Sequence, residues 1–114
     1  MIQTTKHEKG LVVVRPGVER LTAVNAGAFK SEVAELIDAG SSQLVIDFEE
    51  VTFLDSSGLG ALVGIMKKMG HRGDISVCSL DEELKIMFKI SRMDRVFTSF
   101  PDAKSAVSKL SERL

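Results

Sequence analysis

Several features of other protein classes are missing from this chain, and each absence narrows its interpretation. Cys78 is the only cysteine among 114 residues, so no disulfide can form within the chain, and a lone thiol suits a reducing compartment. No apolar run approaches the roughly 20 residues that a helix needs to cross a bilayer. The polar N-terminus, residues 1–7, has no apolar core of signal-peptide length. We therefore expect a cytoplasmic protein without membrane insertion.

The chain also has no excess of charge and no recognisable metal or cofactor motif. It has 15 Lys and Arg residues against 16 Asp and Glu residues, a formal net charge of −1, and no basic block. Binding to nucleic acid by charge is therefore not expected. His7 and His71 have polar neighbours and no Cys or carboxylate at ligand spacing, which indicates surface residues rather than a metal site. Gly58-Leu59-Gly60 lacks the rest of a dinucleotide fingerprint, and no Walker lysine follows, so no cofactor is expected.

What the chain does contain is enough apolar material for one core, since 44% of its residues are hydrophobic. We expect a single domain over residues 1–114. Period-2 and continuous apolar segments predict strands, and residues 2–5 are expected to pair with the first long strand across a turn. The predicted strands cover residues 11–14, 44–48, 75–78 and 96–97.

Amphipathic segments between these strands predict helices. The first begins at Ala26 and is ended by Gly40, and the second is closed by Gly70. Asp81 is the expected N-cap of the third, and Pro101 is expected to open the last. Strands that alternate with helices predict an α/β fold. Its mixed, mostly parallel sheet has four to five strands, an N-terminal antiparallel hairpin and about four helices.

The most informative stretch is residues 53–62, which reads FLDSSGLGAL. It places Asp55, Ser56 and Ser57 where a strand-side loop meets a helix N-terminus, at the ligand-facing edge of a parallel sheet. Free N–H groups at a helix start favour negative charge, so a phosphate on Ser56 is not opposed by its own helix. The residues alone leave another interpretation open, in which Ser56 or Asp55 is simply the N-cap. Ser57 is the competing phosphoacceptor.

The element order and residues 51–62, VTFLDSSGLGAL, closely resemble the STAS domain of bacterial anti-sigma factor antagonists. The resemblance extends over roughly residues 11–110. It implies that Ser56 is phosphorylated by a partner of the GHKL type that is both a serine kinase and an anti-sigma factor. It also implies that the unphosphorylated chain binds this partner and frees the sigma factor. Phosphorylation abolishes that binding, and a PP2C-type phosphatase restores it.

We accordingly expect a partner-switching regulator without enzyme activity, either a monomer or a weak dimer. One departure from the family pattern lies in the loop before the first helix, where many members carry an aspartate. Thr22 falls at about that position here and carries no charge. Arg20 can compensate by pairing with a phosphate, and Glu19 is a second candidate. The residues expected to contact the partner surround Ser56: Thr22, Asp55, Ser57, Gly58, Leu59 and Gly60.

The glycines and leucine after Ser57 have alternative interpretations. A glycine lowers helix stability by about 1 kcal/mol relative to alanine, so its presence suggests a packing or docking reason. We favour close packing of the helix on its own sheet at Gly64, and approach of a partner backbone at Gly58. Leu59 faces a partner if the first turn projects, and is otherwise a core residue.

Three other functions stay open at this point. The first is a constitutive STAS interaction module of a signalling scaffold or transporter complex, which Thr22 favours and in which Ser56 is only a cap. The second is a serine hydrolase, which needs a base within reach of Ser56; His7 and His71 lie in predicted loops and are poor candidates. The third is a receiver domain with Asp55 as phosphoacceptor, although the acidic pair and the lysine that such chemistry needs are not evident.

Overall fold

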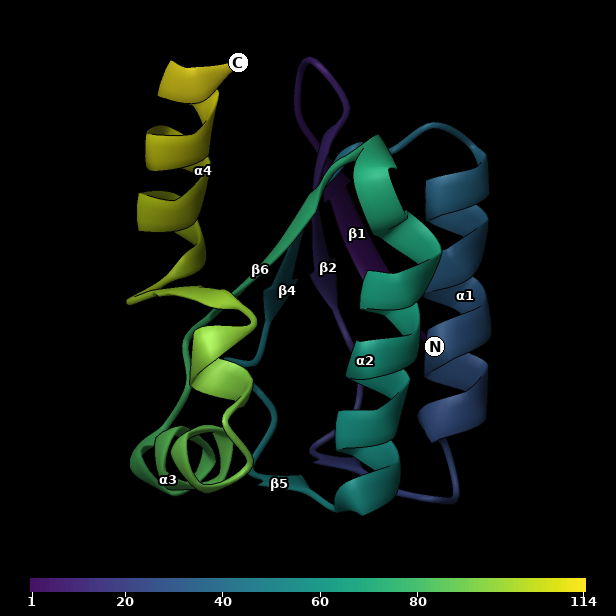
Figure 1. The fold of residues 1–114 in the computed structure, drawn as a ribbon, viewed down its shortest axis with the longest axis vertical. Coiled ribbons are helices and arrows are strands. Elements are labelled where there is room, and N and C mark those ends of the chain that lie inside the picture. The colour runs from purple at the N-terminus through teal and green to yellow at the C-terminus, as the bar shows by residue number, and fades with distance from the viewer.

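A computed structural model describes residues 1–114. Five strands form one mixed sheet in the order β1-β2-β4-β6-β7, in which β1 is antiparallel to β2 and the remaining neighbours are parallel. This arrangement confirms the predicted α/β fold with its N-terminal hairpin (Figure 1). The five strands are β1 (Gln3–Lys6), β2 (Leu11–Arg15), β4 (Gln43–Asp47), β6 (Asp74–Cys78) and β7 (Thr98–Phe100).

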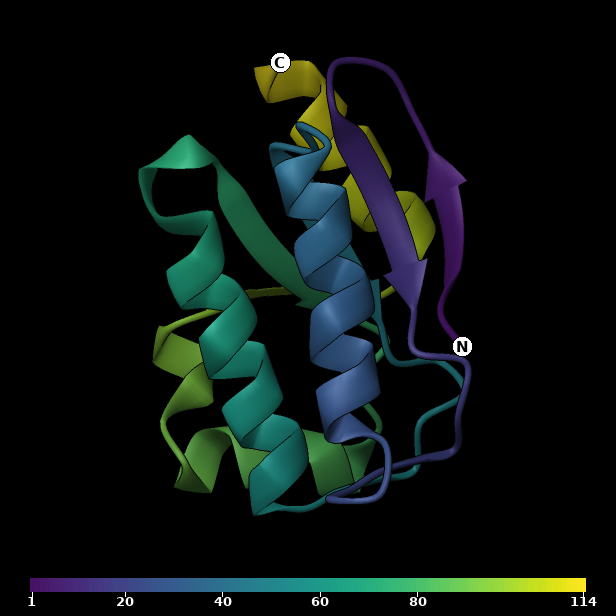
Figure 2. The same ribbon diagram turned by 90° about the vertical axis from the view of Figure 1, so that its right-hand side faces the viewer.

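Four α-helices surround the sheet. Two of them, α1 and α2, lie side by side on one face, α4 lies on the other, and α3 closes one end (Figures 1 and 2). Short 3-10 turns follow α2 and α3, at Gly70–Arg72 and Met93–Arg95. The helices are α1 (Ala26–Asp38), α2 (Ser56–Met69), α3 (Glu82–Ile90) and α4 (Ala103–Arg113).

The central strands β2 and β4 are buried on both faces, as expected for a continuous apolar run. Val12 and Val14 pack toward α1 and α2 in the larger core, whereas Leu11 and Val13 pack toward α4 in the smaller one. Cys78 belongs to the smaller core and has no exposed surface. Burial raises the pKa of its thiol to about 12.

Two short strands escaped prediction. β3 (Arg20–Leu21) and β5 (Phe53–Leu54) pair in parallel as a separate two-stranded sheet. Each has two residues, too few to display the period-2 alternation by which a strand is detected.

Two predicted boundaries are wrong. The last strand begins at Thr98, because Phe97 completes a turn, with its N–H bonded to the Met93 carbonyl at 2.9 Å, and buries its ring in the core. Pro101 precedes α4 rather than opening it. Asp102 is the N-cap, and its carboxylate accepts the N–H of Ser105 at 2.7 Å.

Candidate functional site

The small β3–β5 sheet brings the loop before α1 next to the start of α2, at one end of the molecule (Figures 1 and 2). Leu21 and Leu54 are opposite each other and fully buried, which anchors both strands to the core. Arg20 and Phe53 form the neighbouring pair, with the Arg20 guanidinium 4.2 Å from the centre of the Phe53 ring. Arg20 is thus already engaged in a cation–π contact.

Asp55 joins the two segments. Its Oδ1 accepts the N–H of Gly58 at 3.0 Å, and its Oδ2 accepts the N–H of Ala23 at 3.1 Å. These hydrogen bonds, that of Gly58 foremost, hold the pKa of Asp55 below its usual range against the opposing effect of desolvation. Asp55 is therefore both the N-cap of α2 and a link to the loop that precedes α1.

Ser56 is the first residue of α2 and is exposed. Because Asp55 caps the helix, the interpretation of Ser56 as the N-cap is wrong, and the alternative that assigned the cap to Asp55 is confirmed. No acidic residue lies in the first turn, so the free N–H groups at this helix start meet no negative side chain after the cap. Ser57, the competing phosphoacceptor, is half-buried.

The glycines of α2 have different surroundings. A Cβ on Gly58 would lie 2.6 Å from the Leu21 carbonyl oxygen, so the space beside Gly58 is filled by its own chain rather than open to a partner. A Cβ on Gly64 would lie 2.7 Å from Cε of Lys30. Gly64 therefore packs against α1, and the prediction that it packs against the sheet is wrong. Gly60 is exposed and has open space where a Cβ would be.

Thr22 lies beside this site without contributing charge to it. Its hydroxyl accepts the N–H of Val24 at 3.3 Å, and its own N–H donates to Oδ1 of Asn25 at 3.0 Å. The next residue, Ala23, is the one bonded to Asp55. The structure therefore brings Thr22 close to the start of α2, as expected from the sequence, within a turn stabilised by its own hydrogen bonds.

An apolar depression beside the site was missed by sequence reasoning. Leu59, half-buried in the first turns of α2, is at its edge, and Ile86 and Ile90 of α3 are 57% and 78% exposed. Their spacing of four residues, on the side of α3 away from buried Leu84 and Phe88, was the available signal. The depression is lined by Leu59, Glu83, Ile86, Met87, Ile90 and Ser91.

Both histidines are exposed, which confirms their interpretation as surface residues. His71 follows the far end of α2, a helix of 14 residues, and so lies about 20 Å from Ser56. His7 lies in the turn before β2, at the end of that strand opposite to the loop that reaches β3. Neither imidazole is a base for the Ser56 hydroxyl.

Comparison with known proteins identifies the family. The model of the STAS domain matches residues 3–106, and the chain therefore belongs to the STAS domain family. The anti-sigma F factor antagonist of Paenibacillus polymyxa is 22% identical over 107 residues, which cover 92% of this chain and 91% of that protein.

Solved structures of similar fold include an anti-sigma-factor antagonist (STAS) domain protein from Planctomyces limnophilus. Its TM-score is 0.86 at 21% identity, and the match covers 96% of this chain and 97% of that one. The Bacillus cell fate determinant SpoIIAA in its phosphorylated form matches with a TM-score of 0.74 at 19% identity, over 96% of this chain and 99% of that one.

The same fold occurs within a much larger protein, the murine Solute Carrier 26 family member A9 anion transporter. That match has a TM-score of 0.78 at 19% identity and covers 94% of this chain but 18% of the transporter. In the present chain, none of the helices combines the length and the apolar character required to span a membrane.

Proposed function

We propose that this chain is an anti-sigma factor antagonist that acts by partner switching, with Ser56 as the phosphorylated residue. The unphosphorylated form binds an anti-sigma factor that is also a GHKL-type serine kinase, and thereby frees a sigma factor. Phosphorylation abolishes this binding, and a PP2C-type phosphatase restores it. The chain has no enzyme activity of its own and acts in the cytoplasm as a monomer or weak dimer.

The observation that carries this proposal is an exposed serine at the first position of α2 that capping does not use. Serine before a helix is ordinarily a cap, and here Asp55 has that role. The hydroxyl of Ser56 is left accessible to a kinase. Membership of the STAS family and the similarity to an anti-sigma F factor antagonist support the same function.

The electrostatics of α2 suit a switch with little internal movement. A phosphoserine adds about −1.5 to −2 charges. At the start of α2 this charge meets the positive end of the helix, where no acidic residue follows the cap. The like charge of Asp55 is moderated by its two backbone hydrogen bonds. The phosphorylated fold is therefore expected to remain intact.

The partner surface we propose extends from Ser56 over the apolar depression. Leu59 is three residues after Ser56, so the two side chains lie on the same side of α2. A partner that covers Leu59 and the exposed Ile86 and Ile90 would also cover Ser56. A phosphate there would lose its water, and the lining of the depression offers no cation to pair with it. The expected loss of affinity is at least about a hundredfold, or about 2.7 kcal/mol.

The proposal is tested by incubating the chain with ATP and each GHKL kinase of its own host, then locating added phosphate by mass spectrometry. We expect phosphate on Ser56. Ser56→Ala should bind the kinase and accept no phosphate, and Ser56→Asp should bind about a hundredfold more weakly. Ser57→Ala is the matched control and should still accept phosphate, on Ser56. Phosphate on Ser57, or equal binding by the two Ser56 variants, would contradict the proposal.

A second candidate function is a constitutive STAS interaction module of a signalling scaffold or transporter complex. The observation that favours it is the uncharged Thr22, whose hydroxyl is bonded within its own turn, together with Arg20 held on the Phe53 ring. A stable complex with one kinase but no phosphate on Ser56 would support this candidate. If Thr22 is the cause, Thr22→Asp should then gain phosphorylation in the same assay.

A further inference from the structure

A pocket of about 360 Å³ lies where β4 and β6 begin, on the face of the sheet that carries α4. This volume is within the range of small-molecule sites, about 300–1,000 Å³. Gln43 and Asp74, the first residues of the two strands, line it, and the last turns of α4 contribute Leu110 and Arg113. The pocket is at the opposite end of the molecule from the start of α2 (Figure 1). It is therefore separate from the candidate site around Ser56.

Four polar side chains form a compact group in this pocket. Gln43 is the register partner of Asp74, and Ser76 is the register partner of Thr98. All four line the pocket and lie on the same face of the sheet. Neighbouring strands are about 4.8 Å apart, and residues two apart along a strand are separated by about 6.6 Å. The group therefore covers about 5 Å by 7 Å, which is about the size of one six-membered ring with its substituents.

Two of these side chains are buried without a hydrogen bond. Gln43 is 8% exposed and Ser76 is 3% exposed. Arg15 Nε is the one fully enclosed side-chain nitrogen or oxygen that has no partner. The Gln43 amide and the Ser76 hydroxyl make no hydrogen bond within the chain, so their polar atoms open into the pocket that both residues line. Because buried polar groups are ordinarily hydrogen-bonded, these two are available to a ligand or to water.

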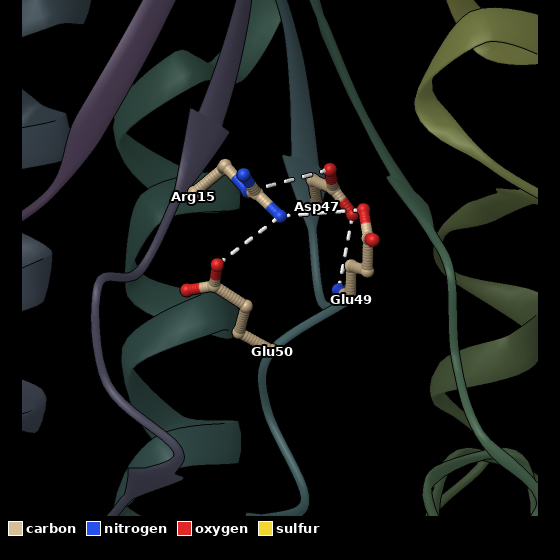
Figure 3. Close-up of polar contacts among 4 residues, drawn as sticks. All are labelled: Arg15, Asp47, Glu49 and Glu50. Carbon is tan, nitrogen blue, oxygen red and sulfur yellow. Dashed lines mark hydrogen bonds and ion pairs between the residues drawn. The ribbon is translucent and has the colours of Figure 1, made fainter.

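The other end of β4 shows a contrasting arrangement. There the Oδ1 of Asp47 accepts the N–H of Glu49 at 3.0 Å. The Nη2 of Arg15 lies 3.2 Å from the Glu49 carboxylate and 3.4 Å from that of Glu50 (Figure 3). The charged side chains at this end are thus engaged with one another. The unbonded groups distinguish the Gln43 end of the strand as a position for a ligand.

The pocket favours a neutral ligand that both donates and accepts hydrogen bonds. Asp74 and Arg113 are the charged side chains of the lining, and their charges balance. An amide and a hydroxyl each donate and accept. A simple cation only donates, and would leave the N–H groups of the Gln43 amide without an acceptor. A simple anion only accepts, and would leave the Gln43 carbonyl oxygen without a donor.

The layout of the polar groups narrows the class of ligand further. They are spread over two dimensions rather than along one line, which suits hydroxyls placed around a ring better than the single polar edge of a base. No aromatic side chain lines the pocket, so a flat base would find nothing on which to stack. A ring that carries several hydroxyls matches both the spacing and the mixed donors and acceptors.

We propose that this pocket binds a neutral monosaccharide. Hydroxyls of the sugar donate to the Gln43 carbonyl oxygen and the Asp74 carboxylate, and accept from the Gln43 amide and the Arg113 guanidinium. The hydroxyls of Ser76 and Thr98 take either role. This site shares no residue with the surface proposed for the kinase.

The test titrates glucose, galactose and mannose separately into the full chain and follows amide chemical shifts in ¹H–¹⁵N spectra. A ligand of about 12 non-hydrogen atoms is expected to have a Kd in the millimolar range. We expect at least one sugar to give saturable shifts at the starts of β4 and β6 and at the end of α4. The absence of saturable shifts there with all three sugars would overturn the proposal, and would mean that water alone occupies the pocket.

Analogues of the sugar that binds best test the selectivity. Cyclohexanol keeps a six-membered ring but has a single hydroxyl, and should bind at least tenfold more weakly. The uronic acid and the 2-amino derivative of the same sugar add a negative and a positive charge, and each should bind at least threefold more weakly. Equal binding of cyclohexanol, or of either charged derivative, would contradict the proposal.

Two pairs of variants locate the site. Gln43→Leu removes the amide at nearly constant size and should weaken sugar binding at least tenfold. Gln3→Leu alters an exposed glutamine outside the lining and should change binding less than twofold. Because Gln43 is buried, a second pair uses exposed neighbours on β7: Thr98→Trp should block binding, and Ser99→Trp, on the opposite face, should not. Unchanged binding in Gln43→Leu or in Thr98→Trp would contradict the proposal.

Discussion

Helices α2 and α3 begin with the same kind of cap and differ in the residues after it. Each is capped by an aspartate that accepts the N–H of the third residue after it: Gly58 at 3.0 Å in α2 and Leu84 at 2.8 Å in α3. After the cap, α3 has two glutamates in its first turn, whereas α2 has Ser56 and Ser57. The positive end of α3 is therefore met by its own side chains, and that of α2 is not.

The third position differs as well. Leu84 buries its side chain in the core, but the corresponding Gly58 has no side chain because the Leu21 carbonyl occupies that space. The cap, the two glutamates and Leu84 at the start of α3 thus all add to the stability of the fold. The start of α2 lacks both the acidic side chains and the buried third side chain that stabilise α3. It leaves the hydroxyl of Ser56 accessible. Of these two differences, the glycine is explained by the chain's own packing, whereas Ser56 and Ser57 replace acidic residues without a gain in stability.

The largest effect on stability is expected at Gly58. A Cβ there would meet the Leu21 carbonyl at 2.6 Å, so Gly58→Ala should lower the free energy of unfolding by about 1–3 kcal/mol. Gly60→Ala is the matched control in the same helix. It meets open space and should raise the free energy of unfolding by up to about 1 kcal/mol. Urea unfolding measures both, and effects of the same sign would show that steric contact does not distinguish the two glycines.

The next largest effect on stability is expected when the N-cap aspartate of either helix is replaced by alanine. Asp81→Ala should lower the free energy of unfolding by about 1 kcal/mol, the usual loss when an N-cap is removed. Asp55→Ala should lower it further, because Asp55 also holds the Ala23 N–H. The same unfolding measurement compares them. Equal losses would mean that the link from α2 to the loop before α1 contributes nothing to stability.

A smaller effect is expected from exchanging the first-turn residues. Ser56→Glu gives α2 the acidic side chain that α3 has, and should raise the free energy of unfolding by about 0.3–1 kcal/mol. Glu82→Ser should lower it by a similar amount. If the proposed function is correct, Ser56→Glu also loses kinase binding while it gains stability. A destabilised Ser56→Glu protein would show that the start of α2 is not free to accept negative charge.

The smallest effect concerns pH. The pKa of Asp55 is held below its usual range in the fold by the Gly58 and Ala23 N–H groups. Its contribution to stability is therefore complete above the unfolded pKa, about 3.9, and is lost as pH falls through the lower folded value. The advantage of wild type over Asp55→Asn should be constant from about pH 8 to about pH 5 and shrink below about pH 4. An advantage unchanged at about pH 3 would contradict this assignment.

Much of the fold could be predicted because it depends on patterns that are continuous along the chain. The continuous apolar run over residues 11–14 predicted β2, and the amphipathic segment from Ala26 predicted α1. Gly40, the predicted end of that helix, follows it with a φ of +102°. The cap at Asp81 was predicted from its position before two glutamates and confirmed in the structure. These patterns involve residues that are close in the sequence, so they can be read without knowledge of the tertiary contacts.

The details of the site could not be predicted because they depend on residues far apart in the sequence. The contact of Gly58 with the Leu21 carbonyl and the bond from Asp55 to Ala23 both join segments that only the β3–β5 pairing brings together. The glycine was accordingly assigned to a partner instead of its own chain. The motif predicted where the candidate site lies, and the tertiary structure explains the contacts of Asp55 and Gly58 within it.

The buried position of Cys78 makes the chain suitable for reporting its own opening. Its thiol has no exposed surface and, with a pKa of about 12, is almost entirely protonated at neutral pH. A thiol reagent can therefore modify it only in molecules in which the smaller core around Cys78 has opened. The rate at which the reagent labels Cys78 therefore reports how often this core opens, and no substitution is needed to measure it. A fluorophore on a cysteine introduced at exposed Ser111 would in turn be free of background from the native thiol.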